Sequence, residues 1–227
     1  MKTIIVIGGS KGIGNAIVKK LLNHSKVINI SRTSPEDNHA NLTHYSCDVT
    51  KDDFPTIESA DGLIYCPGSI NLKPISRLSI NDFKEDFEIN VLGAVKAIQN
   101  YLPILKNGNN PAVVLFSTVA AKLGMPYHAS IATSKAGVEG LVKSLGAELA
   151  PTIRVNAIAP TVTNTQLASK LLRNDKMIEN ITERHPLKKF LNPEEVADMA
   201  EFLISEKSAS QSGQIFEMDC GIVSFKI

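Results

Sequence analysis

Short apolar, β-branched runs alternate along this chain with longer stretches of helical spacing, and this alternation constrains the fold most. The apolar runs cover residues 3–7, 26–31, 43–47, 62–66, 112–117, 153–158 and 214–218. The helical stretches cover residues 13–24, 53–58, 80–106, 130–149 and 193–205. Strands that are apolar on both faces and separated by helices are typical of a parallel sheet covered on both sides. We therefore predict a single α/β domain over residues 1–227, with a Rossmann-type doubly wound sheet of about seven strands flanked by helices.

The overall composition excludes several classes of protein. The 227 residues carry a formal net charge of +1, which implies no general attraction to nucleic acid. The three cysteines, Cys47, Cys66 and Cys220, lack metal-type spacing and are expected to be buried thiols in a reducing compartment. The N-terminal apolar stretch is too short for a signal peptide or a membrane span. We expect a cytoplasmic protein with no metal site and no nucleic-acid or membrane partner.

A glycine-rich turn, Gly8-Gly9-Ser10-Lys11-Gly12-Ile13-Gly14, lies between the first apolar run and an amphipathic stretch. Glycines let the backbone turn tightly and approach a pyrophosphate closely. The helix that follows directs unpaired N–H groups and its positive dipole end at the phosphates. This context favours nucleotide binding over a merely structural turn.

Together with motifs farther along, this turn resembles the short-chain dehydrogenase/reductase family over nearly all of the chain. The glycines Gly8, Gly12 and Gly14 have the family's spacing, and Asn90 stands in the family's Asn-Val-Leu-Gly context. Thr118 follows the apolar run 113–117, and Lys135 follows Ala132-Thr133-Ser134. In the family the residue four before this lysine is a tyrosine, which exchanges a proton with the substrate oxygen. Here that residue is Ile131.

The resemblance implies a nicotinamide nucleotide site, and the charges indicate which nucleotide it prefers. The second strand ends in Ser31-Arg32-Thr33, without the carboxylate that would repel a 2′-phosphate. Arg32 and Lys11 can bind a phosphate, although both could also be solvated surface cations. We therefore predict NADP(H) in preference to NAD(H). The implied cofactor-binding residues are Gly8, Ser10, Lys11, Gly12, Ile13, Gly14, Ser31, Arg32, Asp48, Val49, Gly68, Asn90, Lys135, Pro160 and Thr165.

Three of the family's four catalytic roles have residues here. The resemblance implies that Lys135 holds the ribose, that the Thr118 hydroxyl binds the substrate oxygen, and that Asn90 holds a water. Isoleucine has no titratable proton, so the role of the tyrosine is not filled at position 131. Tyr127, one helical turn before, and His128, where a subgroup of enoyl reductases places its tyrosine, are the possible substitute acids. A water relay from Thr118 is a third route, and both side chains could instead line a loop after Pro126.

Residues 164–190 correspond to the family's mobile substrate lid. Their apolar residues recur at helical spacing, which suits an apolar or acyl-type small molecule but equally suits a helix packed on the core. The helices 80–106 and 130–149 correspond to the family's dimer interface, so a homodimer or homotetramer is expected. Two functions remain open. One is an NADP(H)-dependent oxidoreductase acting on a carbonyl or an activated C=C bond, with a substitute proton donor or none. The other is a nucleotide-binding sensor or silent partner subunit without turnover.

Overall fold

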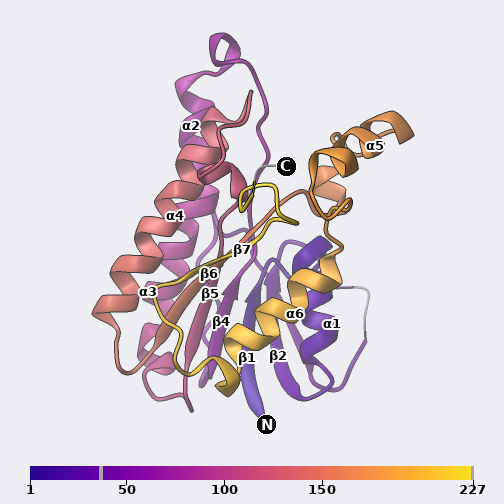
Figure 1. Ribbon diagram of the computed structural model, residues 1–227. Coiled ribbons are helices and arrows are strands. Elements are labelled where there is room, and N and C mark those ends of the chain that lie inside the picture. The colour runs from indigo at the N-terminus through magenta and orange to yellow at the C-terminus, as the bar shows by residue number, and fades with distance from the viewer. Residues whose placement is uncertain (36–37, 226–227) are drawn as a thin grey trace.

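A computed structural model describes residues 1–35 and 38–225 and contains one seven-stranded parallel sheet (Figure 1). Its strand order is β3-β2-β1-β4-β5-β6-β7. The strands are β1 (Lys2–Ile7), β2 (Ser25–Ser31), β3 (Leu42–Ser46), β4 (Gly62–Tyr65), β5 (Ala112–Phe116), β6 (Arg154–Pro160) and β7 (Ile215–Met218). Every predicted strand is present, and the predicted doubly wound α/β fold is confirmed.

Helices cover both faces of the sheet. They are α1 (Gly12–Leu21), α2 (Ile80–Phe87), α3 (Gly93–Leu105), α4 (Ala129–Glu148), α5 (Asp175–Arg184) and α6 (Pro193–Ile204). Helices α3 and α4 pack with one face of the sheet in one buried apolar cluster, and α1 and α6 pack on the opposite face in a second cluster. The short helices are η1 (Ile75–Arg77), η2 (Glu88–Leu92), η3 (Val119–Ala121), η4 (Gln166–Ala168) and η5 (Glu206–Ser208). None of the helices in the described part of the chain is long and apolar enough to cross a membrane.

Two helix predictions need correction. The helix predicted over residues 53–58 is wrong, because this stretch is irregular. Pro55 lacks an N–H group and disfavours helical geometry at the residue before it. Its carbonyl instead accepts a hydrogen bond from the Tyr101 hydroxyl at 2.9 Å, and Phe54 and Ile57 are buried. The single helix predicted over residues 80–106 is divided into α2 and α3 by the π-helical turn η2.

The sheet positions the candidate site through its reversal of strand order at β1. Strand β1 pairs with β2 on one side and with β4 on the other. Strands β2 and β3 therefore extend the sheet to one side of β1, and β4 to β7 extend it to the other. In such sheets ligands bind in the crevice at the carboxyl ends of the strands. The glycine turn, residues 66–69 and residues 117–118 all follow strands at this edge.

Residues 164–190 leave this edge after β6 and return to it. Their base is closed by hydrogen bonds from Asn164 N to Leu191 O at 2.8 Å and from Leu191 N to Val162 O at 3.0 Å. Helix α5 extends away from the body of the molecule, and none of its side chains is fully buried. Helix α5 itself therefore contributes no residue to the two buried apolar clusters. All three cysteines are free; Cys47 and Cys220 are buried, and Cys66 is only partly covered.

Candidate active site

The glycine turn adopts conformations that side chains would disfavour. Gly8 has φ +79° and Gly12 has φ +53°, both in the left-handed region that favours glycine. A Cβ at Gly14 would lie 2.2 Å from Gly8 O, so the first turn of α1 can approach the loop this closely only with glycine. A Cβ at Gly12 would lie 3.2 Å from the Thr165 methyl, which places the turn beside the segment after β6.

Asn29, a buried amide on β2, holds the glycine turn and was missed by sequence reasoning. Its Oδ1 accepts a hydrogen bond from Gly9 N at 2.9 Å, and its Nδ2 donates to Ser31 Oγ at 2.8 Å. The predicted Ser31 thus helps to fix the turn through Asn29. A polar residue inside the apolar run 26–31 was the available signal, because a buried amide requires partners.

Both predicted phosphate-binding cations lie at the rim of the turn. Lys11 and Arg32 are exposed, and the loops that carry them are joined by a hydrogen bond from Thr33 Oγ1 to Ser10 Oγ at 3.1 Å. No carboxylate follows β2 before Pro35. The rim therefore presents positive charge at the end of the second strand.

Asp48 and Val49 lie after β3. The Asp48 carboxylate accepts hydrogen bonds from Thr50 N at 3.0 Å and Thr50 Oγ1 at 2.7 Å. These bonds lower the pKa of Asp48, and the Arg32 charge adds to the effect. Val49 is buried in the apolar core. Asp48 therefore fixes the turn after β3.

One cleft brings together two of the three predicted catalytic residues, Thr118 and Lys135, while Asn90 lies outside its lining. Thr118, His128, Ile131 and Lys135 all line it, as do Ile13, Gly68, Pro160 and Thr165 from the predicted cofactor set. Tyr127 does not line this cleft, and its side chain is 59% exposed. The structure thus separates the two possible substitute acids, with only His128 facing the space beside Ile131.

Lys135 is the buried charge of the cleft. Its ammonium donates to Phe116 O at 2.8 Å, and its other N–H groups have no acceptor among the described residues. Burial lowers the pKa of Lys135 to about 8, and the nearby Cys66 and Asp86 act in the opposite direction. The ammonium therefore has donors available for a ligand.

Thr118 and His128 have hydrogen bonds that leave one polar group of each available. Thr118 Oγ1 accepts from Ala120 N at 3.3 Å, so its own O–H can donate to a ligand. His128 Nδ1 lies 2.7 Å from Pro126 O. Because a carbonyl only accepts, Nδ1 carries a proton and Nε2 is the nitrogen left for another partner.

Gly68 lies close to two polar groups. A Cβ there would lie 3.1 Å from Asn90 Oδ1 and 3.5 Å from Lys135 Nζ. Asn90 Oδ1 is buried and has no hydrogen-bond partner among the described residues. The unpartnered Asn90 acceptor and the Lys135 donor therefore both lie near Gly68, and of the two side chains Lys135 lines the cleft.

Thr161 and His185, which were also missed by sequence reasoning, join the cleft to the base of residues 164–190. Thr161, which lines the cleft, lies with its Oγ1 2.7 Å from His185 Nε2, and both residues are buried. His185 Nδ1 lies 2.7 Å from Ile181 O. The imidazole therefore holds the Thr161 hydroxyl in place at the end of β6.

Comparison with known proteins identifies the family. Residues 8–223 match the family model described as enoyl-(acyl carrier protein) reductase. The chain belongs to the short-chain dehydrogenase/reductase family. It is 28% identical over 242 residues to the 3-oxoacyl-(acyl-carrier-protein) reductase FabG of Aquifex aeolicus, covering 97% of each chain. It is 25% identical over 233 residues to carbonyl reductase (NADPH) 2 of Sus scrofa, covering 97% of this chain and 96% of the other.

Solved structures of this family have the same fold. The aldohexose dehydrogenase of Thermoplasma acidophilum superposes with a TM-score of 0.91 at 29% identity, covering 99% of this chain and 95% of that one. An ElxO variant with NADPH bound has a TM-score of 0.88 at 25% identity, covering 99% of this chain and all of that one. This short-chain dehydrogenase/reductase is therefore an oxidoreductase of a family that uses a nicotinamide cofactor and acts on small molecules.

The residues present fit such a nucleotide. The glycine turn forms a cradle that a Cβ at position 14 would fill, and helix α1 begins at Gly12 within it. The unpartnered Asn90 Oδ1 and the Lys135 donors lie farther along the same edge of the sheet. The glycine turn would hold the pyrophosphate, and Lys135 would hold ribose hydroxyls.

Proposed function

We propose that this short-chain dehydrogenase/reductase is an NADPH-dependent reductase of an apolar or acyl-type small molecule. It transfers a hydride to a carbonyl or an activated C=C bond, with His128 as proton donor in place of the usual tyrosine. The observation that carries this proposal is the shared cleft, which Lys135, Thr118 and His128 line together with the apolar Ile131.

The preference for NADPH rests on charge at the rim. Arg32 and Lys11 are exposed cations on loops that a hydrogen bond joins, and the end of β2 lacks a carboxylate. A planar guanidinium can bind a phosphate with two parallel hydrogen bonds. This arrangement favours a 2′-phosphate over an unmodified ribose.

The substrate class rests on the lining of the cleft. Apolar side chains contributed by several segments predominate, among them Ile70, Phe116, Val119, Met125, Val162, Leu167 and Leu171. Leu167 and Leu171 come from residues 164–190, the proposed lid. An apolar wall with a few convergent polar groups suits a hydrophobic ligand with one polar functional group.

The proposed chemistry assigns a separate task to each polar side chain. The bound nicotinamide supplies the hydride. The Thr118 O–H donates a hydrogen bond to the substrate oxygen, and Lys135 holds the ribose and adds positive charge as negative charge develops on that oxygen. The protonated His128 transfers its Nε2 proton to the substrate and becomes neutral imidazole. Ile131 contributes an apolar wall and no proton.

Substituting the two neighbours, Tyr127 and His128, tests the proton donor. Wild type, His128→Ala and Tyr127→Phe are compared for NADPH oxidation across a panel of ketones, 3-oxoacyl thioesters and enoyl thioesters. General acid help is worth about 10²–10⁴-fold, so His128→Ala is expected to lose that much ketone reduction while Tyr127→Phe keeps it. Enoyl reduction is expected to be less sensitive, because water can supply its proton. Unchanged ketone reduction in His128→Ala would remove His128 from the mechanism.

The alternative function, nucleotide binding without turnover, is favoured by Ile131 itself, because this side chain can never donate a proton. The same panel distinguishes the two functions. If wild type binds NADPH but no compound in the panel supports its oxidation, the protein would be assigned to the sensor or partner-subunit class.

We also propose a homodimer or homotetramer that forms through the helical pair α3 and α4 and the adjoining α2 and η2. Phe87 and Leu92 are large apolar side chains that are 41% and 44% exposed there. A Cβ at Gly140 would meet nothing within 4 Å, so this part of α4 is open to a second helix. Sedimentation equilibrium tests this assembly, and a monomer at micromolar concentration would exclude it.

A further inference from the structure

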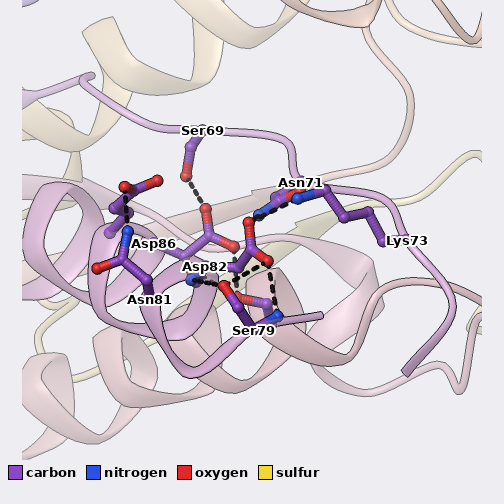
Figure 2. A network of polar contacts seen from close by, with 9 residues as sticks. Ser69, Asn71, Lys73, Ser79, Asn81, Asp82 and Asp86 are labelled. Atoms are coloured by element: carbon purple, nitrogen blue, oxygen red, sulfur yellow. Dashed lines mark hydrogen bonds and ion pairs between the residues drawn. The ribbon is translucent and has the colours of Figure 1, made fainter. Parts of the chain in front are cut away.

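A carboxylate buried behind the cleft, Asp86 on α2, takes no part in the chemistry described above. It is 2% exposed and forms no ion pair within 4.0 Å with any described residue. The nearby cation Lys73 instead binds Asp82, one helical turn earlier, at 2.7 Å (Figure 2). Burying a charge is costly unless hydrogen bonds and an opposite charge compensate it.

The hydrogen bonds of Asp86 come from two different walls of the cleft. Ser69, which lines the cleft, donates to Oδ1 at 2.5 Å (Figure 2). Ser130, the residue before Ile131 on α4, donates to Oδ2 at 2.6 Å. One carboxylate therefore joins the loop after β4 to the first turn of α4.

Asn90 extends this network toward the lysine. Its Nδ2 donates to Ser69 Oγ at 3.0 Å and to the backbone carbonyl of Asp86 at 2.7 Å. A Cβ at Gly68 would lie 3.1 Å from Asn90 Oδ1 and 3.5 Å from Lys135 Nζ. Asn90 therefore links the Ser69–Asp86 network to Gly68, the residue that Lys135 Nζ also approaches.

The groups around Lys135 leave Asp86 as the anion that acts on it. Two titratable groups raise its pKa, Cys66 from the end of β4 and Asp86 from α2. Burial raises the pKa of Cys66 to about 12, so this thiol is uncharged at neutral pH. The walls formed by β5 and α4 add the Phe116 carbonyl and Glu139, whose carboxylate is bonded to Ser117 Oγ at 2.7 Å. The His128 imidazole, at the start of α4, lines the same cleft and brings no negative charge.

We propose that Asp86 is a positioning residue of this cleft: its carboxylate joins the two walls beside Lys135 and is the counter-charge that keeps the Lys135 ammonium protonated. In a site without the tyrosine, the task left to the lysine is to present a positive charge to the nucleotide and the substrate oxygen. A buried ammonium with no anion near it loses its proton readily. Asp86 maintains that charge without occupying the cleft. The functional consequence rests on the proposed nucleotide site, but the charge coupling does not.

Direct titration of Lys135 in the nucleotide-free protein tests the coupling. The protein is labelled with ¹³C at lysine Cε, the Lys135 resonance is assigned with Lys135→Arg, and its midpoint is measured in wild type and Asp86→Asn. The midpoint is expected near pH 8 in wild type and about one pH unit lower in Asp86→Asn. Glu85→Gln, an equal charge change on the exposed side of α2, is the matched control and should leave it in place. Asp86→Glu, which keeps a carboxylate at this position, should have the same Lys135 midpoint as wild type.

Serine variants separate charge from hydrogen bonding. Ser69→Ala and Ser130→Ala keep the carboxylate and are expected to keep the Lys135 midpoint. Should Asp86→Asn fail to fold, Asp86→Ser removes the charge in a smaller polar side chain. A midpoint in either neutral variant equal to that of Glu85→Gln would overturn the proposal.

NADPH binding provides the second readout. At pH 8 about half of the Lys135 side chains are charged in wild type. After a downward pKa shift of about one unit, about one-tenth are charged. The Kd for NADPH at pH 8 should therefore rise about fivefold in Asp86→Asn. An unchanged Kd with a shifted midpoint would refute the functional half of the proposal. A wild type that does not bind NADPH, but in which Asp86→Asn still shifts the midpoint, would refute the proposed function and leave the charge coupling intact.

Discussion

Placing a phenol at position 131 tests whether the rest of the site is correctly arranged. Ile131 lines the cleft four residues before Lys135 and is 5% exposed. A tyrosine side chain there would extend toward the cleft space. A free phenol has a pKa of about 10, and a nearby ammonium favours its ionised form. General acid catalysis is worth about 10²–10⁴-fold, or about 3–5 kcal/mol of activation free energy.

The matched pair is Ile131→Tyr and Ile131→Phe, both made in the His128→Ala protein so that the imidazole cannot supply the proton. The two rings share the steric cost of filling this site, about 1–3 kcal/mol, and differ only in the hydroxyl. Ketone-dependent NADPH oxidation should be about 10²–10⁴-fold faster with tyrosine than with phenylalanine. Equal rates in two folded, NADPH-binding variants would refute the reasoning, because Thr118 and Lys135 would then not be placed for this chemistry.

Three further outcomes are expected. Arg32→Asp should change the ratio of the Kd values for NADPH and NADH by about 10- to 100-fold in favour of NADH, measured by fluorescence titration. Equal affinity of wild type for both nucleotides would refute the preference for NADPH that we infer from the charges of Arg32 and Lys11. Gly14→Ala should lower the free energy of unfolding, measured in urea, by about 1–3 kcal/mol, because the new Cβ would lie 2.2 Å from Gly8 O. Gly140→Ala is the control: its Cβ would meet nothing within 4 Å, so it should be neutral or stabilising. Lys135 has a pKa of about 8 when folded and an ordinary value of 10.5, so between these pH values the unfolded chain binds more protons and folding stability rises with pH. Urea unfolding at pH 8 and pH 10 should show this rise in wild type relative to Lys135→Met, and an equal response of the two proteins would contradict it.

The fold was predictable because its signals are local. Each strand is a short β-branched run between turn residues, and the parallel sheet follows from the alternation of these runs with helices. Where a local signal was overridden, the prediction failed. Phe54 and Ile57 have helix-like spacing, but Pro55 and the packing against Tyr101 produce an irregular segment.

The candidate site was predictable only in part. The glycine turn, Thr118 and Lys135 stand in short motifs that a sequence can reveal. The choice between Tyr127 and His128 was not available, because adjacent residues before a helix point in different directions according to backbone geometry. Tyr127 has φ +69° and is largely exposed, whereas His128 lines the cleft.

The sequence by itself determined that a glycine-rich turn follows the first strand, that no carboxylate stands at the end of the second strand, and that isoleucine occupies position 131, where the resemblance predicts a tyrosine. Those are properties of residue type and short spacing. Tertiary structure alone decided which polar groups meet behind the cleft that Ile131 lines. Ser69, Asp86 and Ser130 come from three segments, and their hydrogen bonds span 17 and 44 residues of chain. No local pattern marks them, because a buried charge is accommodated by partners that only packing brings near it.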